Sequence, residues 1–140
     1  MNLQDLIKLQ IKKASDIFST KDEVENEIRG VFNTIKDLMP DKINFNYKAE
    51  IDNFSDTVTT VYATNPTIEH QYIVLTYDFD NRTIFPVKIT LSDGQNWMCQ
   101  TLDDVKGTLH DILSQDDFMI RLISISKEKG NLIDFDDIPF

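Results

Sequence analysis

The 140-residue sequence predicts an α+β domain: two N-terminal helices, an antiparallel sheet of four to five strands, two C-terminal helices and a short acidic tail. Three observations support this prediction. Apolar residues recur at helical spacing over the first 40 residues, alternate with a period of two from residue 43 onward, and return to helical spacing after about residue 100. We expect one domain over residues 1–130 and a separate tail over residues 131–140.

The first 40 residues contain two apolar stripes at helical spacing, one over residues 3–18 and one over residues 24–39. Between them, Thr20 and Glu23 have the spacing of a capping box, in which a hydroxyl and a carboxylate bind amide groups left free at a helix start. Pro40 follows the second stripe and is expected to end it. We therefore predict two helices with a boundary at Thr20.

Five segments have the composition of strands: residues 43–52, 57–64, 71–79, 85–91 and, as a short fifth strand, 96–100. In the first, Ile43, Phe45 and Tyr47 alternate with polar residues, as a half-buried strand requires. Turn-forming Asn, Asp, Gly and Pro residues separate the segments, which favours antiparallel pairing. Pro86 lacks an amide hydrogen, so it suggests an edge strand or a bulge within the fourth segment.

Two more helices are expected after the sheet. Thr101 and Asp104 have the spacing of a helix cap, and Ser114 and Asp117 repeat that spacing at the start of a second helix. Gly130 suits the end of the last helix, because glycine readily adopts the left-handed conformation found there.

Composition describes an ordinary globular chain, with 41% hydrophobic and 10% aromatic residues. No apolar run approaches the roughly 18 residues that span a bilayer. Lys8, Lys12 and Lys13 interrupt the N-terminal apolar residues, which argues against a signal peptide. The single cysteine, Cys99, rules out an internal disulfide and fits a reducing compartment. We expect a cytoplasmic protein without a membrane partner.

The net charge of −10 argues against binding to duplex DNA, which usually requires a basic patch. The sequence has 14 basic and 24 acidic residues. Any nucleic-acid surface must therefore be local, and base stacking must contribute to it. A homodimer would add area and charge that one subunit lacks.

The final residues form an acidic and hydrophobic segment: Asp134, Phe135, Asp136, Asp137, Ile138, Pro139 and Phe140. Phe140 can fill an apolar pocket while its terminal carboxylate meets an Arg or Lys beside that pocket. Pro139 lowers the entropy lost on binding, because its φ angle is already restricted. Asp136 and Asp137 would steer the segment toward a basic surface.

This segment closely resembles the C-terminal tip of bacterial single-stranded DNA-binding proteins, in which an acidic stretch ends in Ile/Leu-Pro-Phe. Asp134, Asp136 and Asp137 match the acidic stretch, Phe135 matches an aromatic within it, and Ile138, Pro139 and Phe140 match the tip. The resemblance implies recruitment of replication, recombination and repair proteins such as helicases, exonucleases and primase. An acidic tail that only aids solubility would need no terminal Ile-Pro-Phe.

The body departs from that family, since it opens with helices rather than the strands of an OB-fold and offers almost no linker before the tail. Single-stranded DNA binding needs aromatic side chains interleaved with cations. Most aromatics lie in the apolar phase of their strands and are expected in the core. The remaining candidates for DNA contact are Lys48, Tyr72, Arg82, Lys88 and Trp97, with Tyr72 and Lys88 expected on one face of neighbouring strands.

Nothing in the sequence indicates catalysis. His70, His110 and Cys99 have no metal-ligand spacing, and the four glycines form no phosphate-binding loop. We expect a non-enzymatic protein without a metal or cofactor.

Two functional hypotheses follow. In the first, the protein binds single-stranded DNA through an unconventional fold, and its tail recruits DNA replication and repair enzymes; a phage or mobile element would be a fitting source. In the second, it is an interaction protein that mimics the tip to capture or inhibit host repair enzymes without binding DNA. The body could instead be a regulatory or anti-defence domain.

Overall fold

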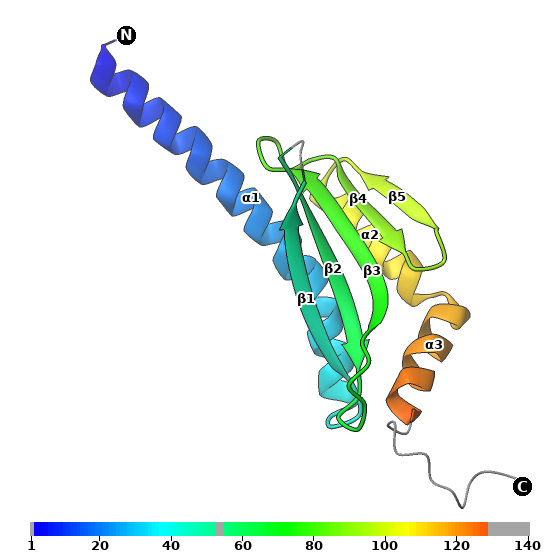
Figure 1. The fold of residues 1–140 in the computed structure, drawn as a ribbon. Helices are drawn as coiled ribbons and strands as arrows, with labels where there is room; N and C mark the ends of the chain where they lie inside the picture. The colour runs from blue at the N-terminus through cyan, green and yellow to red at the C-terminus, as the bar shows by residue number, and fades with distance from the viewer. Residues whose placement is uncertain (1, 53–54, 129–140) are drawn as a thin grey trace, which may run out of the picture.

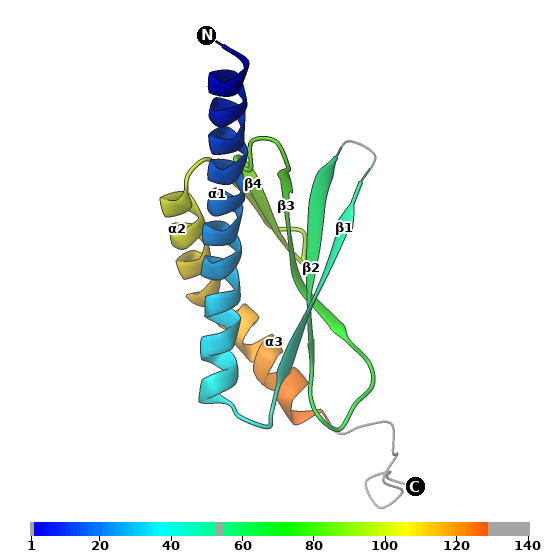
Figure 2. The ribbon, with the colours of Figure 1, turned by 90° about the vertical axis from the view of Figure 1, so that its left-hand side faces the viewer.

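The computed structural model describes residues 2–52 and 55–128. In this part of the chain, three helices pack on one face of a five-stranded antiparallel sheet (Figures 1 and 2). The elements are α1 (Leu3–Leu38), β1 (Asn44–Ile51), β2 (Asp56–Thr64), β3 (Tyr72–Asp80), β4 (Val87–Leu91), β5 (Asn96–Cys99), α2 (Leu102–Leu113) and α3 (Asp116–Lys127). The antiparallel sheet and the two C-terminal helices confirm that part of the prediction.

The sheet is a meander in which each strand pairs with the next, in the order β1-β2-β3-β4-β5. The alternation of side chains along each strand separates an inner face, which the helices cover, from an outer face that they leave open (Figure 2). In β2, for example, Thr57, Thr59, Val61 and Ala63 are buried and the residues between them are partly exposed.

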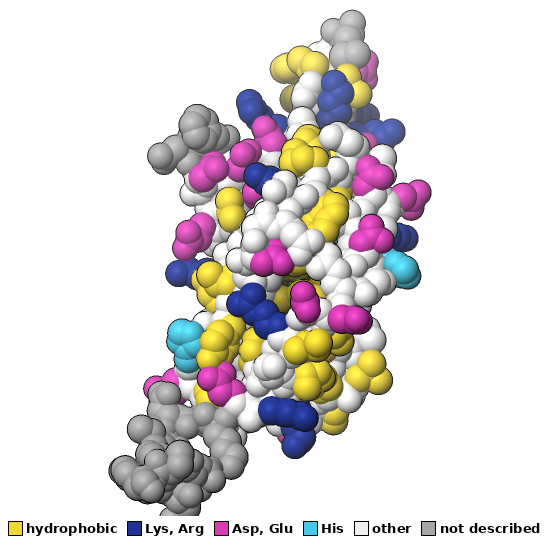
Figure 3. Space-filling model, turned by 90° about the vertical axis from the view of Figure 1, so that its right-hand side faces the viewer, with side chains coloured by type: hydrophobic (Ala, Val, Ile, Leu, Met, Phe, Trp, Pro, Cys, Tyr) yellow, Lys and Arg dark blue, Asp and Glu magenta, His cyan; other side chains and the backbone are white. Residues whose placement is uncertain are grey.

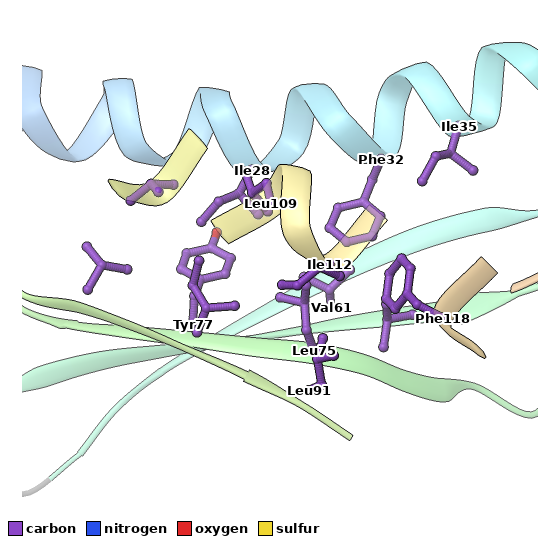
Figure 4. Close-up of a cluster of buried hydrophobic side chains, with 14 of the residues drawn as sticks. Ile28, Phe32, Ile35, Val61, Leu75, Tyr77, Leu91, Leu109, Ile112 and Phe118 are labelled. Atoms are coloured by element: carbon purple, nitrogen blue, oxygen red, sulfur yellow. The ribbon is translucent and has the colours of Figure 1, made fainter. Parts of the chain in front are cut away.

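The hydrophobic core lies between the inner face and the helices (Figure 4). Ile28 and Phe32 come from α1, Leu109 from α2 and Phe118 from α3, and they meet Tyr77 and its neighbours on the sheet. Because residues from all three helices and from the central strands share this cluster, the described helices and sheet form one packed unit.

The prediction of two N-terminal helices is wrong, because α1 runs without a break from Leu3 to Leu38. At the predicted boundary, the Thr20 hydroxyl donates a hydrogen bond to the Asp16 carbonyl, 2.9 Å away and one turn earlier. A threonine that bonds in this way is satisfied inside a helix and does not need to cap a new one. The helix instead begins at Asn2, whose side chain accepts a hydrogen bond from the Asp5 amide.

The later sequence signals have different outcomes. Thr101 caps α2 as predicted, accepting a hydrogen bond from the Asp104 amide at 3.1 Å. Ser114 does not cap α3: its hydroxyl donates to His110, and the N-cap position falls on Gln115. Pro86 precedes β4, which lies inside the sheet between β3 and β5.

A buried asparagine attaches the end of α3 to the sheet. Asn65 follows β2, and its side-chain amide donates to the carbonyls of Ile125 and Glu128 at 2.6 and 2.7 Å. These carbonyls belong to the last turn of α3, where intrahelical partners run out. Asn65 therefore stabilises the position of α3 as well as lying in the turn that follows β2.

The first half of α1 extends beyond the sheet (Figure 1). A 36-residue helix is about 54 Å long, whereas strands of eight or nine residues are roughly 30 Å long. Its fully buried side chains accordingly start at Val24. We call residues 3–18 the N-terminal arm. None of the described helices is long and apolar enough to cross a membrane.

Tyr47 links β1 to α1 and should make stability sensitive to alkaline pH. The Arg29 guanidinium carbon lies 4.1 Å from the centre of its ring. Burial raises the pKa of Tyr47 from 10.0 to about 12, and the charge of Arg29 acts against this rise. The unfolded chain therefore releases the phenol proton at a lower pH than the folded protein, and rising pH favours unfolding between those two values.

We expect the unmodified protein to lose stability relative to Tyr47→Phe as pH rises from 10 to about 12, and to show a constant difference below pH 10. Urea unfolding of both proteins, measured across that range, tests this. Parallel pH profiles would contradict the assignment. Using the difference between the two proteins cancels the titration of all other groups.

Candidate nucleic-acid interface

The outer face of the sheet is the open surface on which a nucleic acid could lie. Strand register aligns one row of polar side chains across it: Lys48, Thr60, Thr76, Thr90 and Asn96. The row forms because side chains alternate along each strand, so that the residues between the buried ones point to the outer face. Three neighbouring threonine hydroxyls can donate hydrogen bonds to phosphate or sugar oxygens.

A second row lies beside the first and contains Glu50, Val58, Asp78, Lys88 and Met98. Lys88 is paired directly with Asp78 across β3 and β4. Burial raises the pKa of Asp78 above its ordinary value, and the charge of Lys88 acts against that rise. Lys48 has a similar neighbour, because its Nζ lies 3.4 Å from Glu50 Oε1. Both lysines of the outer face therefore have a carboxylate beside them.

Tyr62 is the aromatic side chain of the outer face that the sequence prediction missed. It lies opposite Asn46 on β1 and opposite the exposed Ile73 on β3. The sequence did not show on which face of the sheet Tyr62 lies, because β2 has a valine on each face: Val58 on the outer face and Val61 on the inner face. The buried Thr57 and Thr59 made the inner phase look no more apolar than the outer one.

Tyr72 does not share a face with Lys88 as predicted. Val61 lies opposite Leu75 but Tyr62 lies opposite Ile73, so Val74 is an extra residue in β3. This β-bulge reverses the side-chain phase in the first part of the strand. Tyr72 therefore packs against the core side, and its hydroxyl donates to Glu128 Oε1 at 2.6 Å. That hydrogen bond raises the pKa of Tyr72.

Trp97 also faces the helices. It is paired with the buried Ile89 across β4 and β5, and it packs partly buried against the core. The shallow hollow beside it is lined by carboxylates of α2, from Asp103, Asp104 and Asp111. An acidic hollow of this kind repels phosphate, so the position of Trp97 does not favour DNA contact.

Arg82 lies in the turn between β3 and β4, where it is engaged by a neighbouring residue. Its Nη2 is 3.1 Å from Asp80 Oδ2 and its Nε is 3.3 Å from Asp80 Oδ1. These hydrogen bonds lower the pKa of Asp80. Because Arg82 is exposed and Asp80 is partly exposed, water screens the pair and a phosphate could compete for the guanidinium.

The five predicted DNA-contact residues thus divide between three places: Lys48 and Lys88 on the outer face, Tyr72 and Trp97 on the helix side, and Arg82 in a turn. On the side of the molecule shown in Figure 3, basic and acidic side chains are interspersed. That side of the described surface therefore lacks the continuous positive charge that most nucleic-acid binders present.

The remaining reactive residues are scattered or buried. Cys99 is buried, with its Sγ 3.4 Å from Thr108 Oγ1, and burial raises the pKa of its thiol. Within residues 2–52 and 55–128, no three His, Cys, Asp or Glu side chains are grouped closely enough to hold a metal ion. The predicted recruiting segment, residues 134–140, lies outside the described residues.

Comparison with protein-family models, with curated proteins and with solved structures gives no match to this chain.

Proposed function

We propose that this protein is a non-enzymatic factor that acts at single-stranded DNA. Residues 134–140 recruit bacterial replication, recombination or repair enzymes, and the outer face of the sheet contacts the strand. The observation that carries the proposal is the sequence of that segment, in which three aspartates precede Ile138-Pro139-Phe140. Its resemblance to the tip of bacterial single-stranded DNA-binding proteins supports this class of partner.

In this proposal Phe140 is the last residue of the chain and binds in two ways at once. Its ring fills an apolar pocket on the partner, and its carboxylate accepts hydrogen bonds from an Arg or Lys at the rim. The three aspartates increase the association rate with a basic surface. Binding should therefore weaken as salt screens this attraction.

The outer face has the elements for sequence-independent contact with a strand. Tyr62 offers a ring for base stacking beside the apolar Ile73. Lys48 and Lys88 supply charge, and the threonine row between them supplies hydroxyl donors. None of the described helices covers this face, which leaves room for an extended strand (Figure 2).

A second candidate function is favoured by the carboxylates. Lys48, Lys88 and Arg82 each lie beside an acidic residue, and the whole chain carries a net charge of −10. Residues 134–140 carry three of those negative charges, so the rest of the chain is at −7, and a body of this charge does not compete for DNA. Such a protein would use residues 134–140 as a mimic of the tip, and would occupy host enzymes instead of delivering them.

Titration of a fluorescent oligo-dT distinguishes the two functions. If the body binds DNA, we expect Lys48→Gln/Lys88→Gln to weaken binding and to reduce the slope of log affinity against log salt by about 1.4, or 0.7 for each lost phosphate contact. The matched control, Lys42→Gln/Lys106→Gln, removes two exposed lysines away from the outer face. Its slope should equal that of the unmodified protein.

A version ending at residue 130 separates the body from the tail. Salt-sensitive binding by both versions would place DNA recognition in the body and support the first function. If neither version binds, DNA contact by the outer face is refuted and the tip-mimic function stands. Equal slopes for the two double variants would refute the assignment of Lys48 and Lys88.

A further inference from the structure

The N-terminal arm presents an apolar face that, apart from Ile17 near its end, nothing in the described structure covers. Leu3, Ile11 and Phe18 have exposed fractions of 73%, 60% and 65%. At 100° per residue, the apolar residues of the arm other than Leu9, which lies on the polar side, fall within an arc of about 140°. They are Leu3, Leu6, Ile7, Ile11, Ala14, Ile17 and Phe18. The charged residues occupy the opposite side: Asp5, Lys8, Lys12, Lys13 and Asp16.

This face continues the stripe that packs on the sheet. Val24, Ile28 and Phe32 lie in the same angular sector and are fully buried farther along the helix. The arm loses that cover only because α1 is longer than the strands (Figure 1). Most of the stability of a helix in a protein comes from packing of its apolar face. Burial against another apolar surface would therefore stabilise it.

We propose that the arm is a homodimerisation element, which packs against the arm of a second copy in antiparallel orientation. A two-fold axis between residues 10 and 11 places Leu3 opposite Phe18 and Ile7 opposite Ala14. The second of these pairs sets a large side chain against a small one, which helps two helices interdigitate. The contact is isologous, so a single apolar face satisfies both partners.

Gln10 supports this register. It is a polar residue within the apolar arc. The proposed axis sets Gln10 opposite Ile11 of the partner and only one residue rise, about 1.5 Å along the helix, from the Gln10 of the partner. Each amide can both donate and accept, so the pair can satisfy itself. A single polar residue in such a contact selects one register over its neighbours, at some cost in stability.

The area and the charges also fit a second copy. Two arms about 24 Å long with apolar faces of this width would bury on the order of 1,000 Å², the lower bound for a stable interface. The arm carries three lysines and two aspartates and so has a charge of +1, whereas the rest of the chain is strongly acidic. Antiparallel packing holds the two acidic bodies at opposite ends.

The same charges disfavour a membrane surface as the occupant. An amphipathic helix that lies on an anionic bilayer usually has an excess of lysine or arginine on its polar face. Here two of the five charges are negative, and the acidic body would be repelled by anionic lipid.

Light scattering during size-exclusion chromatography tests the dimer. The unmodified protein should have twice the 16.2 kDa mass of one chain. Ile7→Gln/Ile11→Gln, which makes the apolar face polar, should elute as a monomer. Lys8→Gln/Lys12→Gln places the same residues on the polar side and should remain a dimer. Circular dichroism and urea unfolding should show that both variants keep the folded body, since the arm lies outside its core.

Disulfide cross-linking tests the orientation. A mixture of Leu3→Cys and Phe18→Cys proteins should form a mixed disulfide under mild oxidation, whereas neither protein alone should cross-link to itself. Cys99 is buried and should not react. Self-cross-linking of Leu3→Cys would show a parallel pair and overturn the proposal. A monomeric unmodified protein would overturn it as well, including one that is monomeric in solution and binds anionic vesicles.

Discussion

We expect Phe140→Ala to weaken binding to a tip-binding helicase or exonuclease by about 30-fold, because an anchor residue in a buried pocket typically contributes 2 kcal/mol or more. The substitution removes the ring that fills the pocket and leaves the partner's apolar lining exposed to water. Extending the chain beyond Phe140 should be equally damaging, because it moves the carboxylate away from the cation at the pocket rim. Isothermal titration calorimetry with the full-length protein measures both effects.

Phe135→Ala is the matched control for this experiment. It removes the same side chain from the same segment, but five residues before the proposed anchor. We expect a smaller loss of affinity than for Phe140→Ala. Equal affinity of Phe140→Ala and the unmodified protein for every tip-binding enzyme would refute recruitment through the terminal phenylalanine, whatever the DNA titration shows.

Phe32→Ala should lower the free energy of unfolding by about 3–5 kcal/mol, the usual range for deleting a buried aromatic ring. Phe32 is almost fully buried, and its ring centre lies 4.8 Å from that of Phe45 and 6.5 Å from that of Tyr47. Truncation leaves a cavity between α1 and β1. Because Phe32 joins the helix to the sheet, the loss should appear as a lower urea midpoint.

Leu38→Ala controls for the change to alanine in the same helix. Leu38 has an exposed fraction of 78%, so its truncation should change stability by no more than about 0.5 kcal/mol. All proteins should be compared at one concentration, because dimerisation would add to the apparent stability. Similar urea midpoints for Phe32→Ala and Leu38→Ala would show that the C-terminal half of α1 does not pack on the sheet.

The proposed dimer and the proposed recruiting segment would act together. The arm begins at one end of the molecule, and α3 ends at the other end of the sheet (Figure 1). Antiparallel arms would therefore leave the end of each α3 away from the dimer contact. Two recruiting segments in one particle would raise the apparent affinity for a partner that offers two pockets.

The sequence was sufficient to predict the elements whose patterns are local. Alternation and turn residues predicted four to five antiparallel strands, and the five observed strands lie near the predicted positions. Thr101 predicted the start of α2 through a cap between near neighbours. The chemistry of residues 134–140 is also local, because it depends on residue types next to one another. Each of these predictions could be made from the sequence because it depends on only a few adjacent residues.

Tertiary structure decided the rest. The bulge at Val74 places Tyr72 on the helix side of the sheet. Thr20 does not cap a second helix, because its hydroxyl donates a hydrogen bond to the Asp16 carbonyl inside one long helix. Whether an apolar residue is covered depends on what lies across from it in space. Leu3 and Phe32 lie on one continuous apolar stripe, yet the sheet ends before it reaches Leu3. Sequence periodicity specifies which side of a helix is apolar, but only the relative lengths of the packed elements determine how much of that side is buried.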